Sequence, residues 1–170
     1  MQTRSNSCRI DRQADNRALE FAAFSWPQIS GATADWPIGA GAVRRDGLNR
    51  ATLLHFAPGR VLAPDPSSTT EALLDAAATQ GVGTTIDVTG KWANYIIAGS
   101  GAARLLACTI ELSAVLEKRA CAAVTLFDCP AVIAPAHEGF EIWLQASYAA
   151  DFLSTAERFG AALQRGIPDP

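Results

Sequence analysis

The sequence predicts an α+β fold with a mixed, mostly antiparallel sheet and three helices. Short apolar runs, several of them alternating with polar residues, are separated by Gly, Pro and Asp turns, which is typical of strands. Helical start and stop signals fall between groups of strands, without the one-to-one alternation of a parallel sheet. With 170 residues, 49% of them hydrophobic, the chain can bury a core without disulfides or metals.

The chain is expected to divide near residue 50. Residues 1–50 are predicted to be an N-terminal arm, partly irregular, because their start is polar and two Trp-Pro pairs favour extended backbone. Trp26 and Trp36, the aromatic residues of those pairs, must pack against this chain's own core or against another subunit. Residues 51–166 are predicted to form a single α+β domain, built either as one unit or as two small fused halves.

The first elements of this domain are two strands and a helix. Apolar runs at residues 51–56 and 60–62 flank a Pro-Gly turn and predict a strand pair. Residues 68–71, Ser-Thr-Thr-Glu, have the spacing of a capping box, and good helix formers follow over residues 72–80. Gly81 supplies the C-terminal stop of this helix.

The middle of the chain predicts two more strands and a second helix. Residues 84–88 and 92–98 are strands, or one long bent strand, with Gly90 at the join. A Gly-Ser-Gly segment then leads into a helix over residues 102–108, for which Ser100 is the expected N-cap.

The last part of the chain predicts three strands followed by a long helix. The strands are expected at residues 120–127, 131–134 and 140–145, with turns between them. The helix is expected at residues 148–164, because apolar side chains recur on one face from Phe152 to Leu163.

Composition excludes some functions and locations. Fourteen Lys and Arg against 17 Asp and Glu give a net charge of -3, which argues against nucleic-acid binding. No apolar stretch approaches the ~20 residues of a membrane span, and the polar start has no secretory h-region. The four cysteines are scattered, so a reducing cytoplasmic location is expected. The charged fraction of 18% indicates either an Ala-rich surface or a surface covered by a partner.

A search for chemistry finds no convincing active site. His55 and His137 have no partner at metal-ligand spacing, so a core and a solvated histidine are expected. Cys121 or Cys129 could form a thiol–imidazole pair with His137, but no Gly-rich oxyanion turn accompanies either thiol. We therefore predict no catalytic, cofactor-binding or metal-binding residue in this chain.

Seven residues are predicted to serve structure or subunit contact: Asp87, Gly90, Trp92, Trp143, Tyr148, Trp26 and Trp36. Asp87 precedes Gly90 by three residues, and the Asp87 carboxylate is expected to accept hydrogen bonds from the backbone amides of a turn. The tryptophans of the strands are expected to be core or interface aromatics. Glu138 and Glu141, at a turn and on a strand, are expected to be solvated.

The run from Asp87 to Ala107, D-V-T-G-K-W-A-N-Y-I-I-A-G-S-G-A-A-R-L-L-A, resembles the D-[VL]-[ST]-x-x-W…G-x-x-A-x-x-LL segment of the gamma subunit of heterotetrameric sarcosine oxidase. The resemblance continues through residues 120–125 and 140–149 and covers roughly residues 60–165. The pattern is more distantly similar to the folate-binding domain of aminomethyltransferase. The acidic pair of those enzymes is missing from residues 129–134, and Ala146 stands where the gamma family usually has Arg.

The resemblance implies a non-catalytic structural subunit of an oxidoreductase. Its partners would be the alpha, beta and delta subunits of a flavoprotein heterotetramer. FAD, FMN, NAD and tetrahydrofolate would belong to the alpha and beta subunits, and zinc to the delta subunit. The assembly would oxidatively demethylate sarcosine or a related N-methyl amino acid in one-carbon metabolism. The alternative is a stand-alone folate-binding or one-carbon-binding protein of the aminomethyltransferase superfamily.

Overall fold

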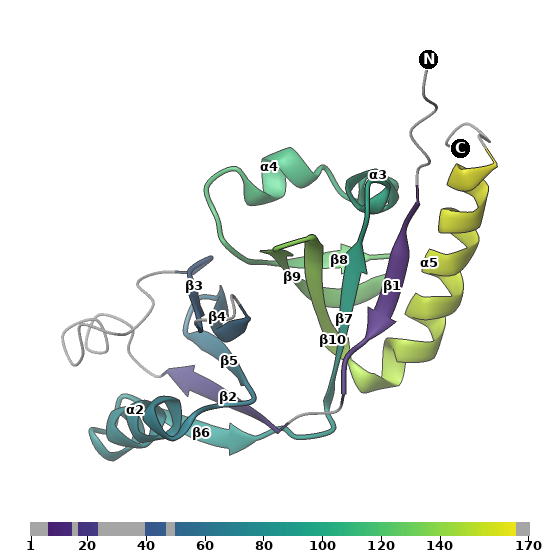
Figure 1. Ribbon diagram of the computed structural model, residues 1–170. Helices are drawn as coiled ribbons and strands as arrows, with labels where there is room; N and C mark the ends of the chain where they lie inside the picture. Colours follow the sequence, from purple (N-terminus) through teal and green to yellow (C-terminus); the bar gives the residue numbers. More distant parts are fainter. Residues whose placement is uncertain (1–6, 15–16, 24–39, 47–49, 166–170) are drawn as a thin grey trace.

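The computed structural model describes residues 7–14, 17–23, 40–46 and 50–165, and its α+β architecture confirms the predicted fold class (Figure 1). The strands are β1 (Arg9–Arg12), β2 (Ala18–Ala23), β3 (Val43–Arg45), β4 (Ala51–Ala57), β5 (Arg60–Pro64), β6 (Gly83–Asp87), β7 (Trp92–Ala98), β8 (Ala122–Leu126), β9 (Cys129–Ala136) and β10 (Gly139–Gln145). The helices are α2 (Ser68–Thr79), α3 (Ala102–Ala107), α4 (Leu112–Leu116) and α5 (Ala149–Gln164), with a 3-10 turn, η1, at Ala146–Tyr148.

The strands form two five-stranded sheets. Sheet A has the order β1-β7-β10-β9-β8, and sheet B has the order β3-β4-β5-β2-β6. Every strand pair in the described part of the chain is antiparallel. Figure 1 shows α2 beside sheet B and α5 beside sheet A, at opposite sides of the molecule.

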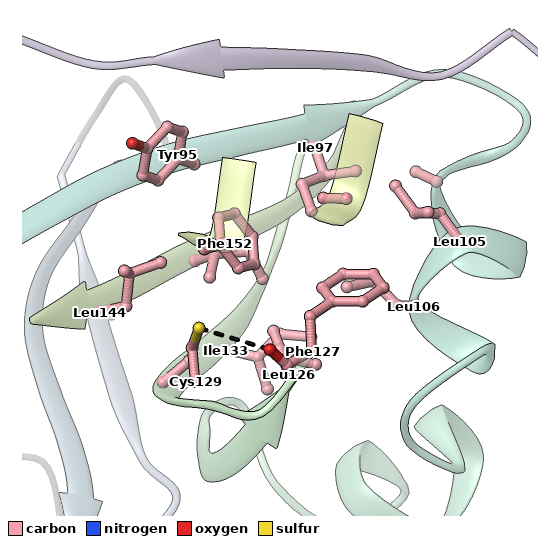
Figure 2. Close-up of a cluster of buried hydrophobic side chains, with 14 of the residues drawn as sticks. Tyr95, Ile97, Leu105, Leu106, Leu126, Phe127, Cys129, Ile133, Leu144 and Phe152 are labelled. Atoms are coloured by element: carbon pink, nitrogen blue, oxygen red, sulfur yellow. Dashed lines mark hydrogen bonds between the residues drawn. The ribbon is translucent and has the colours of Figure 1, made fainter. Parts of the chain in front are cut away.

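The core beneath α5 and α3 contains alternate residues of the sheet A strands. Tyr95, Ile133 and Leu144 come from three neighbouring strands and pack in one cluster with Phe152 of α5. The ring centroids of Tyr95 and Phe152 lie 5.3 Å apart. Figure 2 shows both side chains in this cluster. Because side chains alternate across a strand, the residues between these ones face the other side of the sheet.

That other side faces sheet B across a second cluster, called the inter-sheet cluster below. Its buried members are Ala18, Ala51, Leu54, Phe56, Leu62, Val88, Cys121, Val132, Ala134 and Trp143. A third cluster, which includes Leu53, Val61 and Leu74, joins the outer face of sheet B to α2. Both sheets are therefore apolar on two faces, and they lie between two helical layers.

The described residues of the expected N-terminal arm take part in these sheets. β1 pairs with β7 at the edge of sheet A, and β2 lies inside sheet B between β5 and β6. Phe21 of β2 is fully buried under α2. Residues 9–12 and 18–22 thus belong to the two sheets, and their pairing partners in β7 and β5 are 38 to 89 positions later in the chain, beyond the reach of local sequence patterns.

The helices differ from the prediction in number and in two caps. α4 was not expected, so the described residues contain four α-helices rather than three. The capping box at residues 68–71 places the N-cap of α2 at Ser68, but the N-cap is Ser67, one residue earlier, and its hydroxyl accepts a hydrogen bond from Thr70 N. The prediction of Ser100 as the cap of α3 is wrong, because Gly101 occupies the N-cap and no side chain caps this helix.

Candidate functional site

A cavity of about 320 Å³ lies between the two sheets. It is lined by Gln13, Asp46, Arg50, Ala51, Thr52, Pro64, Asp65, Asn94, Ile96, Glu141 and Trp143. Seven of these eleven side chains are polar or charged, although the cavity borders the apolar inter-sheet cluster. We call it the inter-sheet cavity and treat it as the candidate site.

The sheet A wall of the cavity comes from the paired strands β7 and β10. Asn94 is opposite Trp143 in the strand register, and Ile96 is opposite Glu141. Directly opposed residues project to the same face of a sheet, and so do residues two positions apart. The four side chains therefore form one cross-strand patch on the face turned to sheet B.

The opposite wall is formed by the beginning of β4 and the segments beside it. The carboxylate of Asp46 accepts hydrogen bonds of 2.9 Å from both the backbone N and the side-chain Nε of Arg50, which closes the turn before β4. Asp65 follows β5 with a φ of 42°, a left-handed conformation that Asp tolerates better than most residues. Its carboxyl group is at the exposed rim of the cavity.

Glu141 is the buried carboxylate of this site, with 6% of its surface exposed. Burial raises its pKa, while the Arg45 guanidinium, with Nη1 3.5 Å from Oε2, and a hydrogen bond from the Ala51 backbone oppose the rise. The nearby Asp46 carboxylate adds to the rise. The folded protein therefore keeps the Glu141 proton to a higher pH than an exposed glutamate would.

Three buried polar atoms in the cavity wall have no hydrogen-bond partner among the residues that the structure describes: Asn94 Oδ1, Glu141 Oε2 and Trp143 Nε1. One is a donor and two are acceptors, and all three belong to the cross-strand patch. Buried polar groups in native proteins are nearly always hydrogen-bonded. The patch can therefore take up a molecule that both donates and accepts hydrogen bonds.

Asp87 and Gly90 form the turn between β6 and β7, outside the cavity. The Asp87 carboxylate accepts a 2.9 Å hydrogen bond from Thr89 N, and hydrogen bonding to Thr89 lowers the pKa of Asp87. Gly90 has a φ of 76°, a left-handed conformation that favours glycine. This arrangement is an Asx-type turn, and the Asp87 carboxylate also lies 4.0 Å from the Arg17 guanidinium, with which it forms an ion pair.

Trp92 and Trp143, which the sequence singled out, both meet the inter-sheet cluster. Trp92 is half-buried and packs edge-on against Phe56 at 6.0 Å, whereas Trp143 is buried and lines the cavity. Tyr148 is 37% exposed and ends η1, away from the cavity. Trp26 and Trp36 lie outside the described residues.

The thiol–imidazole alternative receives no support from the cysteines. Burial raises the pKa of Cys121 to about 12, and burial followed by nearby Asp151 and Asp128 raises the pKa of Cys129. His137 follows the far end of β9, about 27 Å from Cys129 at ~3.4 Å per residue. His55 is fully buried and His137 exposed, as the sequence predicted.

The described ranges also carry no cluster of three or more His, Cys, Asp or Glu that could hold a metal ion. None of the helices described combines the length and apolar character needed to cross a bilayer.

The sequence prediction missed most of the cavity wall. Glu138 is exposed as expected, but the prediction that Glu141 is solvated is wrong. In the segment Phe140–Leu144, Glu141 is the one polar residue of an apolar strand and lies two positions from Trp143, so both project to the same face. This spacing was the available signal that Glu141 is buried. Asn94 has the same relation to Trp92. That signal identifies a face of a strand but not the second sheet that covers it.

Comparison with known proteins finds similarity in structure but not in sequence. Neither protein-family models nor curated protein sequences match this sequence. A chain of heterotetrameric sarcosine oxidase from Corynebacterium sp. U-96, solved in complex with pyrrole 2-carboxylate, aligns with a TM-score of 0.76 at 18% identity, covering 94% of this chain and 87% of that one.

Two weaker matches carry no argument about fold or function. The regulatory subunit of aspartate kinase from Thermus thermophilus aligns with a TM-score of 0.43 at 13% identity, over 89% of this chain and 97% of that one. The Methanococcus jannaschii TBP aligns with a TM-score of 0.29 at 12% identity, over 90% and 96%. The match with a TM-score of 0.76 shows that the fold of this chain is that of a chain of heterotetrameric sarcosine oxidase.

Proposed function

We propose that this chain is a non-catalytic, gamma-type subunit of a heterotetrameric, sarcosine-oxidase-like flavoenzyme. The assembly would oxidatively demethylate sarcosine or a related N-methyl amino acid. The observation that carries the proposal is the agreement of fold with a sarcosine oxidase chain over 94% of this chain and 87% of that one. Such coverage means that the fold agreement extends over nearly all of both aligned chains.

The sequence resemblance supports the gamma assignment independently of the fold. The D-V-T-x-x-W pattern falls on the turn after β6 and the start of β7, and the A-x-x-L-L pattern falls on α3. These elements are joined by buried contacts, because Leu105 and Leu106 pack in the same cluster as Tyr95 and Ile97. The residues of the two patterns thus lie on β7 of sheet A and on α3, which packs against it. A pattern shared by a family for structural reasons is expected at such buried positions.

The chemistry of the described side chains favours a structural role. The buried thiols of Cys121 and Cys129 are held protonated and are poor nucleophiles. In this proposal FAD, FMN, NAD, tetrahydrofolate and zinc belong to the alpha, beta and delta partner subunits. Among the described residues, the large apolar side chains that are exposed are Ile86 and Tyr148.

Co-expression with the genes encoded beside this one tests the proposal. The full chain carries an affinity tag, and the purified material is measured by size-exclusion chromatography with light scattering and by visible absorbance. A stoichiometric, yellow complex of several subunits that oxidises an N-methyl amino acid is expected. The tagged chain expressed alone is the control for non-specific association. A colourless monomer under co-expression contradicts the proposal, and one that binds tetrahydrofolate favours the stand-alone alternative.

A further inference from the structure

The two carboxylates that are buried in the described part of the chain, Glu20 and Glu141, differ in how well their charge is compensated. Glu20, 5% exposed, accepts a 2.8 Å hydrogen bond from Arg60 Nε and has Lys91 Nζ at 3.8 Å. Glu141, 6% exposed, has Arg45 Nη1 at 3.5 Å and an Oε2 that makes no hydrogen bond. Because an incompletely paired charge is costly to bury, Glu141 has capacity for a second cationic partner.

The inter-sheet cavity lies beside Glu141, whose charge is balanced by one cation, Arg45, and the cavity wall is acidic. Its wall contains Glu141, Asp46 and Asp65 against one guanidinium, that of Arg50. Asp46 and Arg50 are already bonded to each other at 2.8 Å. A positively charged molecule is therefore favoured in the cavity over a neutral or negatively charged one.

The unsatisfied atoms beside Glu141 define the rest of the ligand. Asn94 Oδ1 needs a donor, and the indole N–H of Trp143 needs an acceptor. Asn94 and Trp143 are directly opposed in the register of β7 and β10, with Glu141 two positions from Trp143 on the same face. A molecule with an ammonium or amidinium group and a nearby acceptor oxygen can satisfy all three, and the cavity is larger than one water requires.

We propose that the inter-sheet cavity is a binding site for a small organic cation that carries a hydrogen-bond-accepting oxygen. Glu141 is the counter-ion, Asn94 Oδ1 accepts a second N–H bond, and Trp143 Nε1 donates to the ligand oxygen. Asp65 at the rim adds attraction for the cation. The site belongs to this chain alone and does not depend on the proposed subunit role.

Four probes of similar size separate the features of the ligand. Glycinamide has both the ammonium group and the acceptor oxygen, methylammonium only the cation, acetamide only the neutral amide, and acetate is an anion. The full chain, or the complex with which it purifies, is titrated by calorimetry and by NMR of the tryptophan indole N–H signals. The signal missing from Trp143→Phe identifies Trp143. Glycinamide should bind most tightly and shift that signal, with methylammonium weaker and acetate unbound.

Variants then assign the charge. Glu141→Gln should weaken glycinamide binding by about tenfold or more, as expected for the loss of a charge-assisted contact. Glu138→Gln, the same change at an exposed position of the same hairpin, should leave it unchanged. Asp65→Asn keeps a residue that tolerates φ > 0 and should weaken binding by a few-fold. Trp143→Phe should abolish the preference for glycinamide over methylammonium.

Several results would overturn this inference. They are acetamide or acetate binding as tightly as glycinamide, equal glycinamide affinity in the Glu141→Gln and Glu138→Gln variants, or the absence of any saturable change with the two cations. A side chain of a partner subunit occupying the cavity in the assembled complex would also overturn it. If Glu141→Gln fails to fold, Asp65→Asn and Trp143→Phe still decide, because affinities unchanged in both variants contradict the site.

Discussion

Replacing Phe152 by Ala tests how α5 is held on sheet A. Phe152 is fully buried, and its ring lies 5.3 Å from that of Tyr95 and 5.9 Å from that of Phe127 (Figure 2). Loss of the buried ring removes about 1.5–3 kcal/mol of transfer free energy, and the cavity left behind raises the cost to about 3–5 kcal/mol. Because two aromatic contacts also disappear, each worth ~0.5–1.5 kcal/mol, a value near the upper end is expected.

Urea unfolding followed by circular dichroism measures this loss. The midpoint should fall while the slope of free energy against urea stays unchanged, since the denatured state is not altered. Phe159→Ala is the matched control, because Phe159 lies on the same face of α5 and contacts Phe127 at 5.4 Å but is only partly buried. Its expected cost is about half as large. A Phe152→Ala loss below about 1.5 kcal/mol, or equal losses in both variants, would refute the packing described here.

Three further predictions concern single side chains. Between the ordinary glutamate pKa of 4.5 and the raised pKa of Glu141 in the folded protein, the folded state binds more protons than the unfolded state, so the free energy of unfolding should fall as pH rises. Glu141→Gln should flatten this pH dependence of the unfolding free energy, measured by urea titration at several pH values. An unchanged pH dependence would contradict the burial of the Glu141 charge. Gly160→Ala, in open space on α5, should raise the thermal midpoint by the equivalent of about 0.5–1 kcal/mol, whereas Gly83→Ala, whose new methyl group overlaps the Phe21 ring, should lower it by about 1–3 kcal/mol. Cys121, with a pKa of about 12, should resist maleimide at neutral pH in intact-protein mass spectrometry until the protein is denatured, and rapid native labelling would argue against its burial.

Local patterns in the sequence predicted most elements after residue 50. The stripe from Phe152 to Leu163 follows the helical period, and α5 occupies nearly the expected range. α2 was similarly marked by the Ser and Thr residues at its start, although its cap lies one residue before the predicted box, and by Gly81, which has a φ of 70°. Such signals depend on residues a few positions apart, so they can be recognised without knowledge of the tertiary fold.

The parts that could not be predicted depend on distant pairing. β1 and β2 are short and are stabilised by strands far along the chain, so their own residues suggest only an arm. Glu141 is buried because sheet B covers its face of β10, a fact that the alternation of residues in β10 cannot reveal. The inter-sheet cavity was missed for the same reason, since its wall combines segments from both sheets.

The composition of the purified native assembly tests the proposed subunit role most directly. The tagged full-length chain, co-expressed with its neighbouring genes, is analysed by light scattering for mass and by flavin absorbance for cofactor content. We expect one copy of this chain in a flavin-containing heterotetramer that turns over an N-methyl amino acid. A homogeneous, flavin-free species with the mass of this chain alone would contradict the assignment.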